Sequence, residues 1–480
     1  MRISILIPSG ILLAVYWGYW FLKDRKRGVP LSVALAFTCL FIPKVNLIHV
    51  NRMYSTAGIR TDDILALVLL IVSLRDSFTY KNRHIRWGIC FLAALTVSNL
   101  ISMFIGRANG YDNAVMFSIL SIVRKYEYFA FALIGIYVTR KTKNAEQTAL
   151  EQLTWMSIFH VIIGLLQVAW LCNVANGGIV TNAEYRGFAV STFNGNYEYG
   201  QYLCLSIVIY VFYFLKAMKE RSVRTMILSA GMILVSLVMA ALTKSRTSLV
   251  IGIVLIVLIL LFSVRKSSSR AMKLVAAAGV FVFLLTGTLF TTGTLKVGRF
   301  SVVNLSEYAE ELRANIEDAD LRGYVEVVRD DEIIEKKTVK SDIQDRSAAI
   351  RFNKWGAALA GFREHPVFGY GTGVTHVIDG NYIKLLAETG IVGTLLWLAM
   401  FVYFMHVMRK AGKRILPGKC AFWMMVSVLM ASVFIDMFEA SKPMEMLWLA
   451  VGLVIALDAG RPAGTEESLP EAGNPEQDNI

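Results

Sequence analysis

Charged residues are scarce in this chain. Only 18% of its 480 residues are Asp, Glu, Lys or Arg, whereas 55% are hydrophobic. A soluble protein of this length needs more polar surface, so the composition excludes a soluble globular enzyme. Apolar runs close to the roughly 20 residues that cross a bilayer recur along the sequence. The sequence therefore predicts an all-α polytopic membrane protein.

Cysteine and metal-binding patterns are also sparse. The five cysteines lie in or at the edges of apolar runs without paired spacing, at Cys39, Cys90, Cys172, Cys204 and Cys420. They indicate neither a disulfide framework nor a zinc site. Asp62-Asp63 opens an apolar helix, where carboxylates cap backbone N–H groups, and Asp330-Asp331 lies at an expected hairpin turn. Neither pair has the surrounding His or carboxylate cluster of a metal site, so no metal is expected.

About thirteen apolar runs predict 12–14 transmembrane helices. They lie near residues 3–22, 30–43, 63–80, 87–105, 115–138, 154–174, 198–216, 225–242, 248–264, 272–291, 383–408, 417–436 and 444–459.

The loops between these runs fall into two alternating sets. One set holds 23 Lys and Arg, and the other holds 8. The first set comprises residues 23–27, 75–86, 139–143, 216–224, 265–273 and 409–414. The positive-inside rule places it in the cytoplasm, which puts the N-terminus outside and the C-terminus inside. This topology also accounts for the net charge of +13, so no nucleic-acid partner is expected.

One long segment, residues 292–382, is expected to form an extracytoplasmic loop domain. It separates a helix bundle over 1–291 from further transmembrane helices over 383–460. Residues 324–328 and 333–339 have the pattern of a β-hairpin, and 346–362 has helical spacing. The last 20 residues, 461–480, are polar and rich in Pro, Gly and Glu, which predicts a disordered cytoplasmic tail.

Arginines cluster on the side predicted to face outward. They are Arg186, Arg246, Arg346, Arg351 and Arg363. The planar guanidinium matches phosphate oxygens in a bidentate way, so converging arginines suggest a bound anion such as a lipid diphosphate. The alternatives are an ordinary loop residue at Arg186, snorkelling to headgroups at Arg246, and a solvated surface charge at Arg346 or Arg351.

Three other polar positions each leave two interpretations open. Arg124 and Glu127, at i and i+3 within an apolar run, form either a structural pair or the lining of a polar cavity. His365 before Pro366 is either a base or a packing residue at a turn. Asp379 either caps the helix that starts near Tyr382 or accepts a proton from a sugar hydroxyl.

Five segments, taken in order, resemble the family of O-antigen ligases and Wzy-type polymerases, which are bacterial membrane enzymes of polysaccharide synthesis. They are RGF with TFNGNYEYGQYL (186–203), SRTSL (245–249), RFNKWGAAL (351–359), EHPVFGYGTG (364–373) and DGNYIKLLAETGIVG (379–393). The resemblance covers roughly residues 180–410.

The resemblance implies a reaction and a location. A glycan carried on undecaprenyl diphosphate would be transferred to an acceptor sugar at the outer face of the bacterial inner membrane. The family is thought to need no metal and no cofactor, because arginines stabilise the diphosphate leaving group. The lipid-linked oligosaccharide and the bilayer are the expected partners, and a chain-length regulator and a flippase are possible further ones.

The resemblance also implies site residues. Arg246, Arg351 and Asp379 are the catalytic candidates, with Asp379 as the base or acceptor-positioning group. The substrate-binding candidates are Arg186, Arg346, His365, Gly369, Gly371, His376 and Asn381. Gly369, Gly371 and Gly373 would let the backbone pass close to substrate.

One departure separates the polymerase from the ligase. Ligases of the family usually carry His-Asn at the start of the final motif, whereas this chain has Asp379-Gly380 followed by Asn381. Many polymerases have Asp-Asn there, which favours a polymerase and counts against a histidine base at that point. The alternatives are a ligase of the same family, a flippase or other transporter of lipid-linked oligosaccharides, and a non-catalytic envelope scaffold.

Overall fold

The computed structural model describes residues 3–49, 58–78, 82–109, 115–176, 179–181, 187–264, 346–372 and 378–460. The first half contains α1 (Leu6–Tyr19), η1 (Trp20–Asp24), α2 (Leu31–Cys39), β1 (Asn46–His49), β2 (Gly58–Arg60), α3 (Thr61–Phe78), α4 (Arg83–Ala108), α5 (Val115–Lys141), α6 (Ala145–Val168), β3 (Val174–Asn176) and β4 (Ile179–Thr181). The second half contains α7 (Asn196–Glu220), α8 (Val223–Leu242), α9 (Arg246–Val264), α14 (Arg346–Glu364), α15 (Asn381–Ala411), α16 (Leu416–Ala431), η2 (Met437–Glu439) and α17 (Ser441–Ala459).

The predicted all-α class is confirmed. Every apolar run that falls within the described ranges contains a helix, and the strands form two short antiparallel hairpins, β1–β2 and β3–β4. The helix expected over 346–362 is α14. The apolar run at 272–291, the expected hairpin with Asp330-Asp331, and the tail at 461–480 lie outside the described residues.

Six of the described helices are long and apolar enough to cross a membrane. They are α4, α6, α7, α8, α15 and the first 18 residues of α9. Among the others, α1, α2 and α16 are shorter than 18 residues, and α3, α5 and α17 carry several charged residues. Several of these charges, including Asp63, Arg124 and Glu127, pair with one another at one end of the bundle. The apolar helices identify the chain as a polytopic membrane protein.

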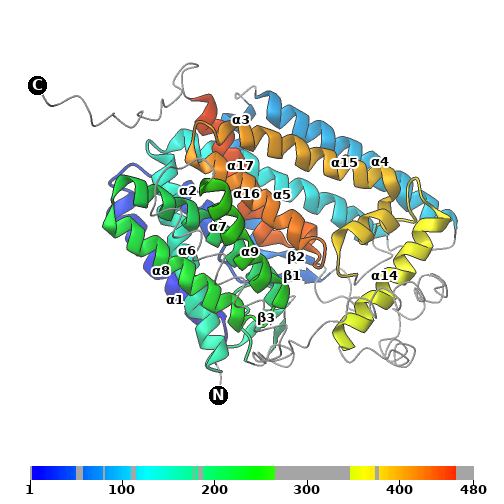
Figure 1. Cartoon of the computed structure of the whole chain (residues 1–480), viewed down its shortest axis with the longest axis horizontal. Helices are drawn as coiled ribbons and strands as arrows, with labels where there is room; N and C mark the ends of the chain where they lie inside the picture. Colours follow the sequence, from blue (N-terminus) through cyan, green and yellow to red (C-terminus); the bar gives the residue numbers. More distant parts are fainter. Residues whose placement is uncertain are drawn as a thin grey trace, which may run out of the picture.

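Contacts among the described residues fall into two groups at opposite ends of the bundle, which agree with the two predicted loop sets where these are described. Three ion pairs join basic residues at or beside the first set to carboxylates at the same end, namely Arg27–Glu151, Lys216–Glu146 and Arg414–Asp458. At the other end, Lys44 pairs with Glu198 at 2.6 Å, and Ile3 bridges to Cys172 just before β3. The N-terminus therefore lies beside β3, whereas the described chain ends at the opposite pole (Figure 1).

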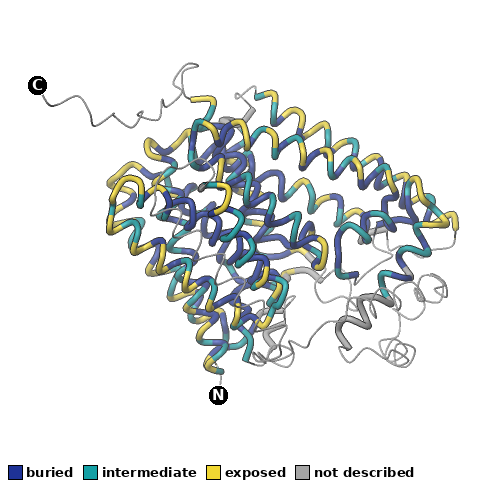
Figure 2. The backbone as a smooth tube through the Cα atoms, in the orientation of Figure 1, coloured by how far each residue is buried: buried dark blue, intermediate teal, exposed yellow. Residues whose placement is uncertain are grey.

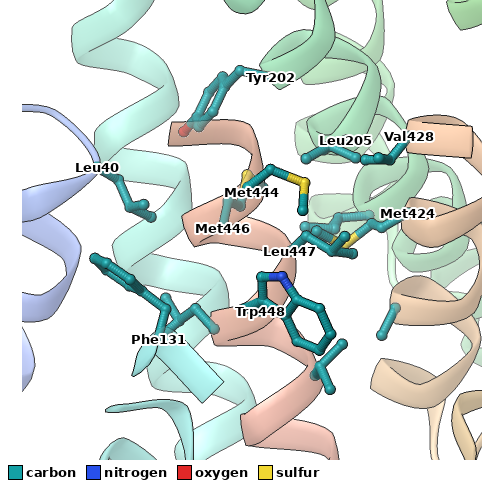
Figure 3. Packing of buried hydrophobic residues seen from close by; sticks show 14 of the residues in the cluster. Leu40, Phe131, Tyr202, Leu205, Met424, Val428, Met444, Met446, Leu447 and Trp448 are labelled. Atoms are coloured by element: carbon teal, nitrogen blue, oxygen red, sulfur yellow. The ribbon is translucent and has the colours of Figure 1, made fainter. Parts of the chain in front are cut away.

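The core is built around α7, α17 and α5. In α7, 78% of the 18-residue apolar stretch is buried inside the protein, against 28–44% of the same stretch in the other candidate membrane-spanning helices. Helix α7 is therefore central in the bundle. Figure 2 shows buried segments through the middle of the bundle and exposed faces around it. Trp448 of α17 packs edge-on against Phe404 and Phe129 at ring distances of 5.0 and 5.2 Å. Figure 3 shows its neighbours Met444 and Leu447 among side chains of the surrounding helices.

The helices α5 and α17 form the most extensive pair, and two glycines allow it. A Cβ on Gly452 would lie 2.6 Å from the carbonyl carbon of Ala132 and nearer still to its oxygen. A Cβ on Gly135 would lie 2.8 Å from the backbone nitrogen of Leu453. Small residues at such crossings let membrane helices approach backbone to backbone.

Candidate active site

A break in α15 is the first feature of the site. Gly390 has φ 64° and ψ −166°, which ends the regular helix after Thr389 and restarts it at Ile391. Few residues other than glycine adopt this backbone conformation. Backbone groups freed by such a break need new partners in a membrane protein.

The loop after α14 supplies those partners. His365-Pro366 follows the last residue of α14, as the sequence predicts. The N–H groups of Ile391 and Val392 donate to the carbonyls of Pro366 and Val367 at 2.9 and 3.1 Å. In the other direction, Tyr370 and Gly371 donate to the carbonyls of Ala387 and Glu388 at 3.1 and 3.0 Å. The EHPVFGYG segment therefore completes the broken helix.

This pairing gives Gly369 and Gly371 a structural role, while the approach to substrate that the sequence suggested stays a prediction. Both have positive φ, at 71° and 112°. A Cβ on Gly369 would lie 2.6 Å from the carbonyl oxygen of Ala387, so this glycine allows contact between the loop and α15. Gly373 lies outside the described residues.

Replacing Gly390 with alanine should separate the loop from α15. The new Cβ would lie 2.5 Å from the backbone nitrogen of Phe368, in a φ region that alanine avoids. We expect a stability loss of about 2–3 kcal/mol, measured as a lower thermal unfolding midpoint in detergent. Gly231→Ala on α8 is the matched control, because its Cβ would meet nothing within 4 Å. Equal midpoints for the two variants would contradict this account.

Asp379 lies where α14, α15 and the 432–440 connection between α16 and α17 meet. The indole N–H of Trp355 on α14 donates to the backbone carbonyl of Asp379. A Cβ on Gly380 would lie 3.0 Å from the carbonyl of Val433 and 3.2 Å from the Trp355 ring. Asp379 itself is partly exposed. The indole of Trp355 therefore holds Asp379 by its backbone carbonyl at this junction.

Asn381, expected to bind substrate, is instead engaged by the protein. The residue is 2% exposed. Its Nδ2 donates to Asp436 Oδ1, and its Oδ1 accepts from the Phe438 N–H at 2.9 Å. Asn381 therefore fixes the 432–440 connection against the start of α15, and its expected part in substrate binding stays a prediction.

A lysine bridges two carboxylates in the same place. Lys384 Nζ lies 2.8 Å from Asp436 Oδ2 and 2.9 Å from Glu439 Oε2. The Lys384 side chain is 7% exposed, whereas those of Asp436 and Glu439 are 22% and 48% exposed. Lys384 is therefore a buried cation, and the two carboxylates that it contacts are partly exposed to solvent.

The surroundings shift the pKa values of Asp436 and Glu439 in opposite directions. Burial and the neighbouring Glu439 raise the pKa of Asp436 to about 7, against the opposing effect of Lys384. Burial also acts on Glu439, but Lys384 outweighs it and holds the pKa of that carboxyl below its usual value. The pair therefore loses its last proton near neutral pH.

A second ionic network lies beside this triad and resolves the question left open at Arg124. Arg124 Nη1 lies 2.5 Å from Asp63 Oδ1 and 2.6 Å from Glu127 Oε2. Arg60, 4% exposed, contacts Asp63 at 3.1 Å and donates to Ser441 Oγ at 3.3 Å. The network joins β2, α3, α5 and α17, so Arg124 and Glu127 are structural, and Asp63 binds arginines rather than only capping its helix.

The TFNGN segment is anchored to the same pole of α17. Lys442 is fully buried and donates to the carbonyl and hydroxyl of Thr192 at 2.8 and 2.6 Å. Asn196 Nδ2 donates to the carbonyl of Thr243 at 2.9 Å, at the turn before Arg246. Lys244 of that turn lies over the Phe188 ring at 4.2 Å. The first two family-like segments therefore pack together.

The 432–440 connection with Lys442 joins the two halves of this arrangement. Through Lys442 it holds the segments around 187–249, and through Ser432 and Asp436 it holds those around 378–384. In Figure 1, β1, β2 and α14 lie toward the same end of the molecule as the start of α15. All five family-like segments thus contribute to one pole of the bundle in their described parts.

The structure describes the predicted site arginines and histidines to different extents. Arg246 opens α9 and is partly buried. Arg346 and Arg351 lie on α14, of which the structure describes only the backbone at these positions. Arg186 and His376 lie outside the described residues. His365 is partly exposed, and its carbonyl accepts from the Gly369 N–H at 2.8 Å.

Lys384, Asp436 and Glu439 were missed from the sequence. The available signal was the polar interruption DMFEASK (436–442) between two apolar runs. Within the described ranges, no group of three or more His, Cys, Asp or Glu side chains is placed to hold a metal ion.

A family model described as O-antigen ligase matches residues 231–398, which run from within α8 to the second half of α15. No curated protein matches the chain. The matched range contains Arg246, the loop after α14, and the Asp379-Gly380-Asn381 motif. The match therefore supports the O-antigen ligase family for this part of the chain, and with it a membrane enzyme that handles glycans.

Proposed function

We propose that this protein is a glycosyltransferase that polymerises lipid-linked oligosaccharide repeat units at the outer face of the bacterial inner membrane. The donor is a glycan on undecaprenyl diphosphate, and the acceptor is the terminal sugar of another lipid-linked unit. A chain-length regulator and a flippase would act with it.

The observation that carries this proposal is the junction at Asp379. It lies within the family match, and α14, α15 and the 432–440 connection meet there. Six helices of the bundle are long and apolar enough to span a membrane, which supports a membrane enzyme with this junction at one end. The basic loop set lies at the opposite end, which favours an extracytoplasmic junction by the positive-inside rule.

The motif itself favours a polymerase over a ligase. Asp379-Gly380-Asn381 stands where ligases of the family usually have His-Asn. A ligase that transfers finished glycan to lipid A core or another acceptor is the second candidate, because the matching family model carries that description.

The deletion phenotype distinguishes these functions. In the host, loss of a polymerase should leave single repeat units on the final acceptor, seen as collapse of the surface glycan ladder on a gel. Long chains retained on the lipid carrier would instead identify a ligase. Units trapped on the cytoplasmic face would identify a flippase.

Arg246 should stabilise the diphosphate leaving group together with Arg351. Removing one such charge from the transition state costs about 100-fold or more in rate. We expect Arg246→Ala to shorten the glycan severely, and Arg246→Lys to retain part of the activity because the charge remains. Arg224→Ala, at the opposite end of α8, should leave chain length unchanged. Normal chain length in both Arg246→Ala and Arg351→Ala would exclude this diphosphate clamp.

A further inference from the structure

We infer that the Asp436–Glu439 pair, held by Lys384, accepts the proton of the acceptor hydroxyl during glycosyl transfer. The inference rests on the proposed function and deepens it. It moves the base from Asp379, on the family-like motif, to the 432–440 connection, which lies outside the matched range.

Accessibility favours this pair as the proton acceptor. The Glu439 side chain is 48% exposed at the outer end of the bundle, and that of Asp436 is 22% exposed. Both oxygens of Asp436 are held from within the protein, by Asn381 and Lys384. Glu439 can therefore contact a sugar hydroxyl while Asp436 remains fixed behind it.

The position of the pair also suits the reaction. Asn381 is two residues from Asp379 and contacts Asp436, so the carboxylate pair and Asp379 border the same junction. Asp379 can then orient the acceptor sugar while Glu439 takes its proton. Asp436 and Lys384 are positioning residues, because they act through Glu439.

The charges around the pair are suited to a proton acceptor near neutral pH. Lys384 lies in contact with both carboxylates, and Glu388 of the same helix and Lys125 of α5 face them from further away. The two carboxylates share the one lysine that contacts them. When both are ionised, the pair therefore carries excess negative charge and can take up one proton. A base whose pKa lies near the working pH is the most effective.

The step balances as a simple displacement. The acceptor oxygen forms a bond to the anomeric carbon of the donor, and the bond from that carbon to the diphosphate oxygen breaks. The hydroxyl proton passes to the carboxylate pair. The electron pair of the broken bond leaves with undecaprenyl diphosphate.

The experiment measures chain growth against pH with the purified full-length protein and a lipid-linked repeat unit. For wild type, we expect activity to rise with pH through about 7, as the pair loses its last proton. Glu439→Gln should lower the rate about 100-fold or more. Lys384→Gln removes the cation that favours the ionised pair, so the rising limb should move to higher pH. Asp379→Asn should lower the rate and leave the limb in place.

Glu151→Gln, at the opposite end of the bundle, is the matched control and should behave as wild type. A wild-type rate and pH profile in Glu439→Gln would overturn the inference. A rising limb of the pH profile that shifts in Asp379→Asn but not in Lys384→Gln would also overturn the inference. Absence of chain growth in wild type would overturn the proposed function, and the inference with it.

Discussion

Gly452→Leu should disrupt the packing of α17 on α5 and prevent accumulation of folded protein. Even a single Cβ at this position would overlap the backbone of Ala132, and backbone cannot move aside as a flexible side chain can. Overpacking of this kind costs about 3 kcal/mol or more when two helices must separate. The measurement is monodisperse yield in detergent together with the thermal unfolding midpoint.

The control for this variant is Gly231→Leu on the exposed face of α8. A Cβ there meets nothing within 4 Å, so yield and unfolding midpoint should stay close to wild type. If Gly452→Leu accumulates and unfolds like Gly231→Leu, the close crossing of α5 and α17 is wrong.

Arg124→Met should cause the second large effect, through the ionic network of Arg124, Arg60, Asp63 and Glu127. The change leaves Asp63 and Glu127 without one of their main cationic partners. Breaking a buried ion pair by removing one member costs about 3–5 kcal/mol, because the remaining charge stays desolvated. A fall of this size in unfolding free energy should accompany lower activity, since α17 and the 432–440 connection are held by the same network.

Two further variants isolate the charge effect at Arg124. Arg27→Met breaks a pair whose side chains are 48% and 32% exposed, so it should cost less than about 1 kcal/mol. Arg124→Met combined with Glu127→Met removes the uncompensated carboxylate and should recover part of the lost stability. An unfolding midpoint for Arg124→Met equal to that of Arg27→Met would refute the structural role of the network.

The helices and their grouping by loop charge could be predicted from the sequence, because bilayer thickness imposes long apolar runs and basic loops mark one side. The helix at 346–364 and its end at His365-Pro366 follow from local rules as well. Such features depend on residues that are close together in the chain.

The polar interior could not be predicted in the same way. Arg124 and Glu127 are three residues apart, so their spacing alone suggests a pair, but Asp63 lies 61 residues away from Arg124. Lys384 and Asp436 are separated by 52 residues, and in the sequence Asp436 stands at the end of an apolar run. Long-range pairs of this kind leave no periodic signal in a single sequence.

The glycines of EHPVFGYG show a different limit. Their composition indicates positive φ and close approach, and both are present at Gly369. Composition does not say what approaches. The partner is the broken backbone of α15, and the break itself depends on Gly390, about twenty residues further along the chain.

Purified protein given one defined lipid-linked repeat unit, with no other acceptor, tests the central claim most directly. Mass spectrometry of the products should show lipid-linked chains of two, three and more repeats, with undecaprenyl diphosphate released at each addition. Transfer only after lipid A core is added would contradict a polymerase and identify a ligase. Units that remain unchanged with either acceptor would contradict glycosyl transfer by this protein.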